Sequence, residues 1–277
     1  MASVSELLVN PNKALWEKGD FTRIAATMRE SGDQLVEGLG IRSGMKVLDL
    51  GCGDGTTAIP AARRGADVLG VDIAENLVAA GNARARADGL SNLRFQEGDA
   101  SNLRDLEDDS FDLVVSIFGA MFAPKPFDVA HEMVRVTRPG GQIVMGNWIP
   151  GDPTLVAQIL RISAAYAPPP PPGFVSPMSW GDEALVQERF EAAGIARHNI
   201  RFERVTYVFR QDGPPSELFE TFRRYYGPMM NAFEAAAVTR REGQLADELR
   251  ALFIAHNQGG GRTEIPATFL KVTVRKD

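Results

Sequence analysis

The chain has 277 residues, of which 44% are hydrophobic and 24% are charged, a composition that excludes a fibre or a wholly disordered protein. The formal net charge of -6 gives no general attraction to phosphates, so we expect no nucleic-acid partner. Residues 1–11 lack a signal-peptide pattern, and no run approaches the roughly 20 apolar residues of a membrane span. We expect a cytoplasmic protein with no membrane span, acting as a monomer or homodimer.

The first half of the chain predicts a helical leader followed by alternating strands and helices. Residues 1–40 are expected to be mostly helical. Apolar runs at 47–50, 68–71, 93–96, 111–117 and 142–148 then alternate with helical stretches that begin at Thr56 and cover 75–88 and 127–137. This alternation is typical of a mainly parallel sheet with helices on both faces.

The second half is less regular. Five consecutive prolines at 168–172 indicate an extended linker. We expect a helix at 182–193 and two more strands, at 202–209 and 267–274. A helical insertion at about 214–256 separates these strands, and Pro228 should interrupt it after Gly227. The prediction is a doubly wound α/β fold of seven strands, divided into a helical leader (1–40), a nucleotide-binding core (41–150) and a remainder (151–277) with a helical lid.

The segment 47–56, with the sequence VLDLGCGDGT, predicts the ligand site. An apolar strand runs into a glycine-rich turn and then a helix, the place where α/β folds bind nucleotides. A second strand ends at Asp72, whose carboxylate can accept hydrogen bonds from ribose hydroxyls. In the dinucleotide pattern a glycine or alanine would stand at Thr56, whereas here the glycines alternate at 51, 53 and 55.

These residues resemble the class I S-adenosylmethionine-dependent methyltransferases. Asp49 and the three alternate glycines are similar to the first motif of that family, and residues 70–73, 97–100 and 138–141 to its later motifs. The likeness covers about 46–148. The sequence of 130–141 and the helical leader resemble the ubiquinone and menaquinone biosynthesis type, which acts on small molecules.

The resemblance implies S-adenosylmethionine as cofactor and assigns residues to it. Gly51 and Gly53 would hold the methionine moiety, Asp72 the ribose, and Asp99 the adenine amino group. Asp49 would fix the turn or the ligand's ammonium group. The remaining predicted cofactor residues are Ile73, Ala100, Ser116 and, from the leader, Trp16.

A small, hydrophobic or aromatic acceptor is expected, because apolar side chains are available to line its pocket. The predicted pocket residues are Phe118, Met121, Trp148, Trp180, Tyr225 and Met229. Each of these side chains could equally pack in a hydrophobic core. The same holds for the apolar residues that recur at helical spacing in the insertion, from Leu218 to Phe233.

No general base is evident, and alignment of the acceptor can supply much of the rate of methyl transfer. His131, His198 and His256 are candidates, and His256 is preferred only because it precedes the flexible glycines 259–261. No zinc or magnesium pattern is present, so no metal is expected. Two alternatives remain: a non-catalytic regulatory protein that binds S-adenosylmethionine, and a nicotinamide-dependent oxidoreductase.

Overall fold

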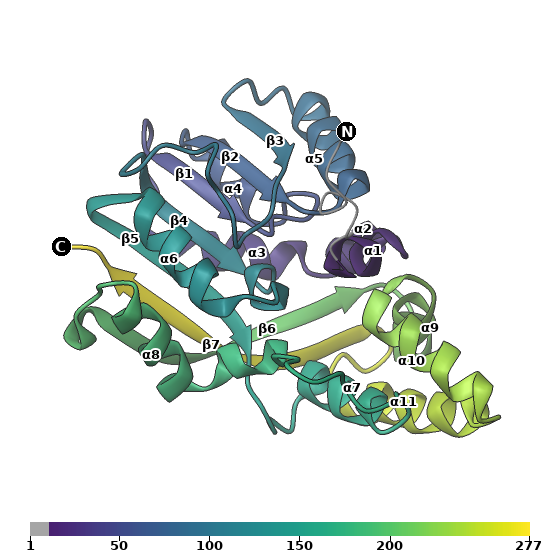
Figure 1. Ribbon diagram of the computed structural model, residues 1–277. Coiled ribbons are helices and arrows are strands. Elements are labelled where there is room, and N and C mark those ends of the chain that lie inside the picture. The colour runs from purple at the N-terminus through teal and green to yellow at the C-terminus, as the bar shows by residue number, and fades with distance from the viewer. Residues whose placement is uncertain (1–10) are drawn as a thin grey trace, which may run out of the picture.

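The computed structural model describes residues 11–277 and contains one seven-stranded sheet within that range (Figure 1). The strands are β1 (Lys46–Leu50), β2 (Asp67–Asp72), β3 (Leu93–Glu97), β4 (Phe111–Ile117), β5 (Thr137–Trp148), β6 (Ile200–Gln211) and β7 (Thr263–Arg275). Their order is β3-β2-β1-β4-β5-β7-β6. Strands β1 to β5 are parallel, and β7 runs antiparallel to β5 and β6. The predicted doubly wound fold is confirmed.

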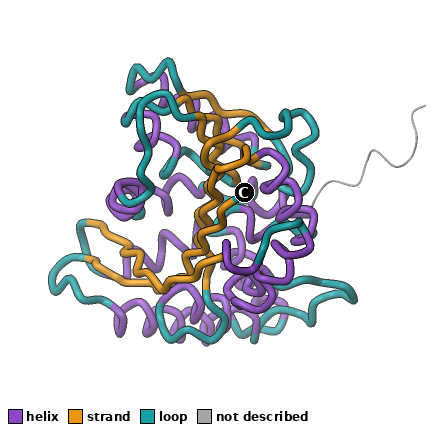
Figure 2. Tube along the Cα trace, turned by 90° about the vertical axis from the view of Figure 1, so that its left-hand side faces the viewer, coloured by secondary structure: helices purple, strands orange, loops and turns teal. Residues whose placement is uncertain are grey.

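Helices cover both faces of this twisted sheet (Figure 2). The helices are α1 (Pro11–Glu17), α2 (Phe21–Ala26), α3 (Arg29–Glu37), α4 (Ala58–Arg63), α5 (Glu75–Ala87), α6 (Pro126–Val136), α7 (Leu155–Ala164), α8 (Glu183–Ala192), α9 (Pro215–Tyr225), α10 (Gly227–Val238) and α11 (Glu242–His256). Short 3-10 turns are η2 (Ala120–Phe122), η3 (Pro177–Gly181) and η4 (Arg197–Asn199).

Alternating side chains of the central strands enter two separate cores. Val47 and Leu113 belong to the core beneath α3 and α4, whereas Leu48 and Val114 face the core that α6, α7 and α8 cover. Both faces of the sheet are therefore buried, which explains why the strands are continuous apolar runs.

The insertion between β6 and β7 consists of three helices. Helix α9 ends at Tyr225 and α10 begins at Gly227, with Pro228 in its first turn, where a missing amide donor costs nothing. The helix is therefore interrupted as predicted, but at Tyr226, before Gly227, instead of after it. Helices α10 and α11 pack on α7, and α9 contacts α2. The leader and the insertion thus lie side by side at one end of the sheet (Figure 1).

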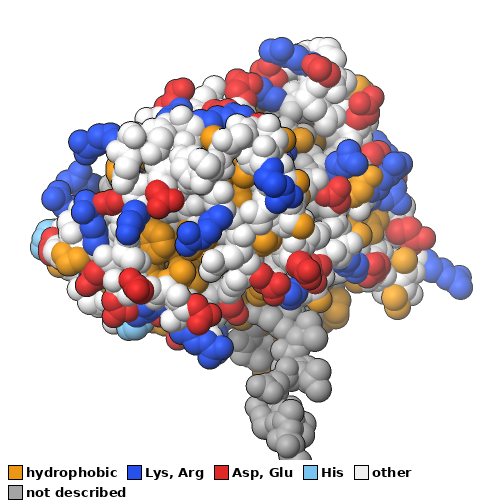
Figure 3. Space-filling view, turned by 90° about the horizontal axis from the view of Figure 1, so that it is seen from above, with side chains coloured by type: hydrophobic (Ala, Val, Ile, Leu, Met, Phe, Trp, Pro, Cys, Tyr) orange, Lys and Arg blue, Asp and Glu red, His pale blue; other side chains and the backbone are white. Residues whose placement is uncertain are grey.

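Positive and negative side chains are interspersed on the face seen from above (Figure 3). Among residues 11–277, no helix combines the length and the apolar character that crossing a membrane requires.

Candidate cofactor and acceptor site

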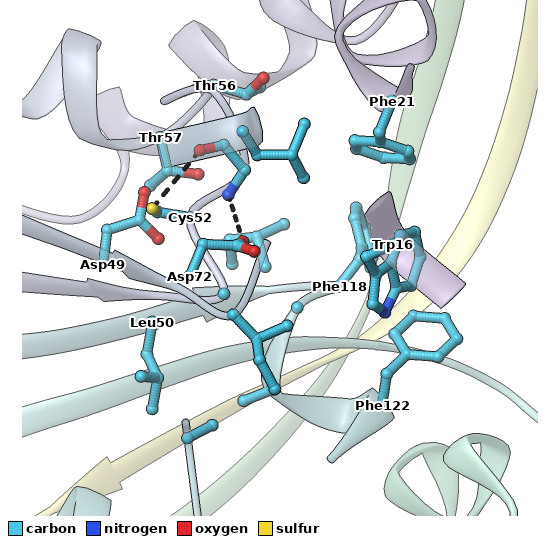
Figure 4. A pocket seen from close by; sticks show the side chains of 18 of the residues that line it. Trp16, Phe21, Asp49, Leu50, Cys52, Thr56, Thr57, Asp72, Phe118 and Phe122 are labelled. Atoms are coloured by element: carbon cyan, nitrogen blue, oxygen red, sulfur yellow. Dashed lines mark hydrogen bonds between the residues drawn. The ribbon is translucent and has the colours of Figure 1, made fainter. Parts of the chain in front are cut away.

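A cleft lies at the carboxyl ends of β1, β2 and β4, where the strand order reverses between β1 and β4. It contains about 950 Å³ of empty space, including the part open to solvent. The turn after β1 and the acids at the strand ends form a polar half, and aromatic side chains form an apolar half (Figure 4).

The glycine turn is fastened to the neighbouring strand. The backbone amides of Gly51 and Cys52 both donate to the carbonyl oxygen of Val71 in β2, at 2.7 and 3.1 Å. Gly51 has a φ of 68°, a conformation that glycine adopts without steric cost. The turn is therefore held open toward the cleft by backbone geometry.

Asp72 links the end of β2 to this turn. Its Oδ2 accepts from the Gly53 amide at 2.8 Å (Figure 4), and its Oδ1 accepts from the Ala74 amide at 2.9 Å. Burial raises the pKa of Asp72, and these amides act in the opposite direction. Each carboxylate oxygen has a second lone pair, so Asp72 can accept further hydrogen bonds from a ligand.

Asp49 is a buried carboxyl at the end of β1 that lines the cleft. Its side chain is 2% exposed, and among the described residues its Oδ2 has no hydrogen-bond partner. Burial raises the pKa of Asp49 to about 8, although the Ala58 backbone amide lowers it. A buried carboxylate oxygen without a donor is suited to a cationic group of a ligand.

Asp54 connects the turn to two helices, a role that the sequence analysis did not assign. Its carboxylate is 1% exposed and lies 2.8 Å from the Arg29 guanidinium of α3 and 3.3 Å from that of Arg84 in α5. Burial raises the pKa of Asp54, and Arg29 opposes that shift. The only available sequence signal was a second acid inside the glycine motif.

The other predicted cofactor residues divide into two groups. Ile73, Asp99 and Ala100 line the cleft, and Asp99 Oδ1 accepts from the amide and hydroxyl of Ser101 at 2.8 and 2.7 Å. Ser116 does not line it. Its hydroxyl donates to the Leu50 carbonyl at 2.6 Å and accepts from an amide of η2, so it joins the ends of β1 and β4 instead.

The apolar half is built from segments far apart in sequence. Trp16 and Phe21 come from the leader, Phe118 and Phe122 follow β4, and Tyr207 belongs to β6. The rings of Trp16 and Phe122 lie 4.8 Å apart, edge to face, and Phe21 stands 5.5 Å from Trp16. Trp16 therefore lies in the aromatic half (Figure 4).

Helix α1 is fastened over the cleft at two points. The Asn12 side-chain amide donates to the Phe122 carbonyl, and Lys13 pairs with Glu97 at the end of β3. The leader thus bridges the β3 side of the cleft and the loop after β4.

Phe118 has an unusual backbone conformation for a side chain of its size. Its φ is 60°, in the left-handed region, and its amide donates to the Gly146 carbonyl at 2.9 Å. The ring stacks on Trp148 with centroids 3.7 Å apart. Trp148 therefore supports Phe118 from behind and does not itself line the cleft.

The other predicted pocket residues are corrected by the structure. Met121, Trp180 and Met229 are at most 1% exposed and pack in the hydrophobic core, and none of them lines the cleft. Tyr225 lies at a shallow surface hollow formed by α9 and α11, apart from the cleft.

None of the three histidines is among the described residues that line the cleft. His131 and His198 are exposed. His256 lies with Nδ1 3.0 Å from the Leu252 carbonyl and Nε2 2.9 Å from the Pro153 carbonyl. Both of its ring nitrogens are directed at backbone oxygens, so the preferred histidine candidate is not placed to act on a ligand in the cleft.

Comparison with known proteins identifies a methyltransferase domain in this chain. The family described as "Methyltransferase domain" matches residues 48–145. The uncharacterized protein Rv1403c of Mycobacterium tuberculosis is 35% identical over 230 residues, which cover 82% of this chain and 80% of that protein. The demethylmenaquinone methyltransferase of Bacillus subtilis is 35% identical over 115 residues, which cover 40% of this chain and 49% of that enzyme.

Solved structures share the fold. Phosphoethanolamine N-methyltransferase 2 of Haemonchus contortus, in complex with S-adenosyl-L-methionine, superposes with a TM-score of 0.61 at 16% identity. The match covers 98% of this chain and 61% of that one. A putative methyltransferase of Bacillus halodurans C-125 gives 0.59 at 16% identity and covers 89% of this chain and 99% of that one.

Proposed function

Because this chain belongs to the class I S-adenosylmethionine-dependent methyltransferases, we propose that it methylates a small, hydrophobic or aromatic acceptor bound in the aromatic half of the cleft. The observation that carries this proposal is the continuity of two unlike surfaces. The glycine turn with its buried acids opens directly onto a chamber walled by Trp16, Phe21, Phe118 and Phe122.

The polar half suits S-adenosylmethionine. Asp72 offers carboxylate lone pairs to the ribose hydroxyls, and Asp99 lies at the end of the neighbouring β3 to accept from the adenine amino group. The orphaned Oδ2 of Asp49 offers an acceptor to the ammonium group. When bound, the cofactor supplies a methyl group carried on a positively charged sulfur.

The chamber favours an acceptor without negative charge. No lysine, arginine or histidine is among the described residues that line the cleft, whereas four aspartates are. An anionic acceptor would find no cationic partner there and would be repelled by the carboxylates. Aromatic walls instead favour a flat apolar molecule or an amine, which aromatic faces attract.

The chain's contribution to catalysis is alignment and exclusion of water. Helices α1 and α2 cover the chamber, and Phe118 is fixed by its stack on Trp148. Holding an acceptor in a single orientation can supply up to about 7 to 11 kcal/mol of the barrier. A dedicated histidine base is not needed for an acceptor that is already nucleophilic.

The test is methyl transfer itself. The purified protein is incubated with methyl-labelled S-adenosylmethionine and a panel of phenols, quinols, amines and matched carboxylates. We expect label in one of the uncharged or amine classes, and loss of transfer in Asp72→Ala. Binding of cofactor with no transfer to any class would favour the regulatory alternative, and transfer to the carboxylates alone would contradict the acceptor assignment.

A further inference from the structure

Tyr207 reaches the cleft from an element outside the matched domain. It lies in β6, at the edge of the sheet remote from the glycine turn in strand order, and beyond residues 48–145. Its side chain is 2% exposed and lines the cleft. The ring stands edge to face with Phe118 at 5.2 Å and with Phe269 at 6.1 Å. Packing therefore fixes the direction of the phenol.

The hydroxyl of Tyr207 lies beside the end of the glycine turn. A Cβ atom added to Gly32 in α3 would lie 3.0 Å from Tyr207 Oη and 2.6 Å from Thr56 Cγ2. Both groups thus border the same point of α3, which only glycine leaves open. Among residues 11–277, the Tyr207 hydroxyl forms no hydrogen bond with another residue.

The Tyr207 hydroxyl is a neutral donor. A tyrosine keeps its proton at physiological pH, and burial raises the pKa of Tyr207 further. At this end of the cleft lie the carboxyl groups of Asp49 and Asp54, and Asp54 is already paired with Arg29 and Arg84. A ligand carboxylate placed here needs neutral donors, since the lining provides no cationic side chain.

We propose that Tyr207 is a cofactor-binding residue whose hydroxyl donates a hydrogen bond to the carboxylate of the methionine moiety. The proposal rests on the proposed function, because it presumes that S-adenosylmethionine occupies the cleft. Asp49 then accepts from the ammonium group, and Tyr207 satisfies the carboxylate of the same amino-acid end. The long β6 strand thereby contributes to cofactor selection, although it lies outside the four sequence motifs.

The experiment compares two ligands by calorimetric titration. S-adenosylhomocysteine carries the carboxylate, and its decarboxylated analogue retains the adenosine, the sulfur and the amine. We expect Tyr207→Phe to weaken binding of S-adenosylhomocysteine about tenfold or more, the effect of removing a hydrogen bond to a charged group. Binding of the decarboxylated analogue should be unchanged. Thermal melting verifies that the variant, which keeps the aromatic ring, is folded.

Tyr226→Phe is the matched control. Tyr226 is 4% exposed in the aromatic cluster at the start of α10 and does not line the cleft, so its variant should bind both ligands like the wild type. An equal change for both ligands in Tyr207→Phe, or no change for either, would overturn the assignment of Tyr207 alone. Failure of the wild-type chain to bind S-adenosylhomocysteine would contradict the proposed function, and the Tyr207 assignment with it.

Discussion

Gly51 and Gly119, which both line the cleft, lie in direct backbone contact. A Cβ on Gly119 would lie 2.3 Å from the Gly51 carbonyl oxygen, and one on Gly51 would lie 2.6 Å from the Gly119 Cα. The turn after β1 and the loop after β4 therefore meet so closely that neither of these two positions has room for a side chain. This contact joins the polar half of the cleft to the aromatic half.

Substitution of Gly119 should separate the two loops. We expect Gly119→Ala to lower the unfolding free energy by about 1–3 kcal/mol, the usual cost of overpacking, and to weaken S-adenosylhomocysteine binding. Urea unfolding and calorimetry measure the two effects. Gly243→Ala is the control, because Gly243 lies in α11 with open space around it and alanine favours a helix by about 1 kcal/mol. If Gly119→Ala is destabilised but binds S-adenosylhomocysteine like the wild type, the contact between Gly51 and Gly119 does not contribute to ligand binding.

Asp49 should give stability an unusual dependence on pH. Its folded-state pKa of about 8 lies above its ordinary value, so the folded state retains a proton that the unfolded chain has lost. The resulting stabilisation is present below about pH 4 and disappears as the pH rises through 8, with a slope of up to about 1.4 kcal/mol per pH unit.

The matching variant is Asp49→Asn, which cannot ionise. In the absence of ligand, its unfolding free energy relative to wild type should increase between pH 4 and pH 8, as measured by urea denaturation across that range. Parallel pH profiles for the two proteins would show that Asp49 is not a buried acid with a raised pKa.

Arg29 should stabilise the glycine turn through Asp54. Arg29→Met leaves a carboxylate that is 1% exposed with only the more distant Arg84, so we expect a loss of about 1–3 kcal/mol in unfolding free energy. The comparison is Arg63→Met, which breaks a more exposed pair with Asp88 and should cost less than about 1 kcal/mol. Equal losses in urea unfolding would mean that the burial of Asp54 has no energetic consequence.

The fold was predictable because the hydrophobic pattern of the sequence matches the strands and helices of the structure. Apolar runs gave β1 to β5, and the turn chemistry placed Asp49, Asp72 and Asp99 at one sheet edge, since parallel strands end together. Helix α7 was missed: it follows Gly151 and Pro153 and directly precedes the proline run, so local signals favoured a loop.

The acceptor half was predicted less well, because it depends on tertiary contacts. In the sequence, Trp148, Trp180 and Met229 are large apolar residues, just as Phe118 and Phe122 are. Only tertiary packing decides which of these side chains face the cleft. Tyr207 had no motif around it. It lies inside the strand predicted at 202–209, but only tertiary packing against Phe118 brings its side chain to the cleft.

Replacing a cleft side chain and a core side chain by alanine should therefore have different effects. Phe122→Ala should change which acceptors are methylated, because its ring lines the chamber in contact with Trp16. Met229→Ala should lower stability by about 2–5 kcal/mol through a core cavity while leaving the ratio of acceptor kcat/KM values unchanged. A shift in acceptor preference in Met229→Ala, with Phe122→Ala unaffected, would place the acceptor near the insertion instead.

The central claim is tested most directly by calorimetric titration of the purified protein with S-adenosylhomocysteine, with NADH and NADPH titrated in parallel. The account predicts micromolar binding of S-adenosylhomocysteine and none of the nicotinamide cofactors. Binding of NADH or NADPH, with no heat from S-adenosylhomocysteine, would contradict it.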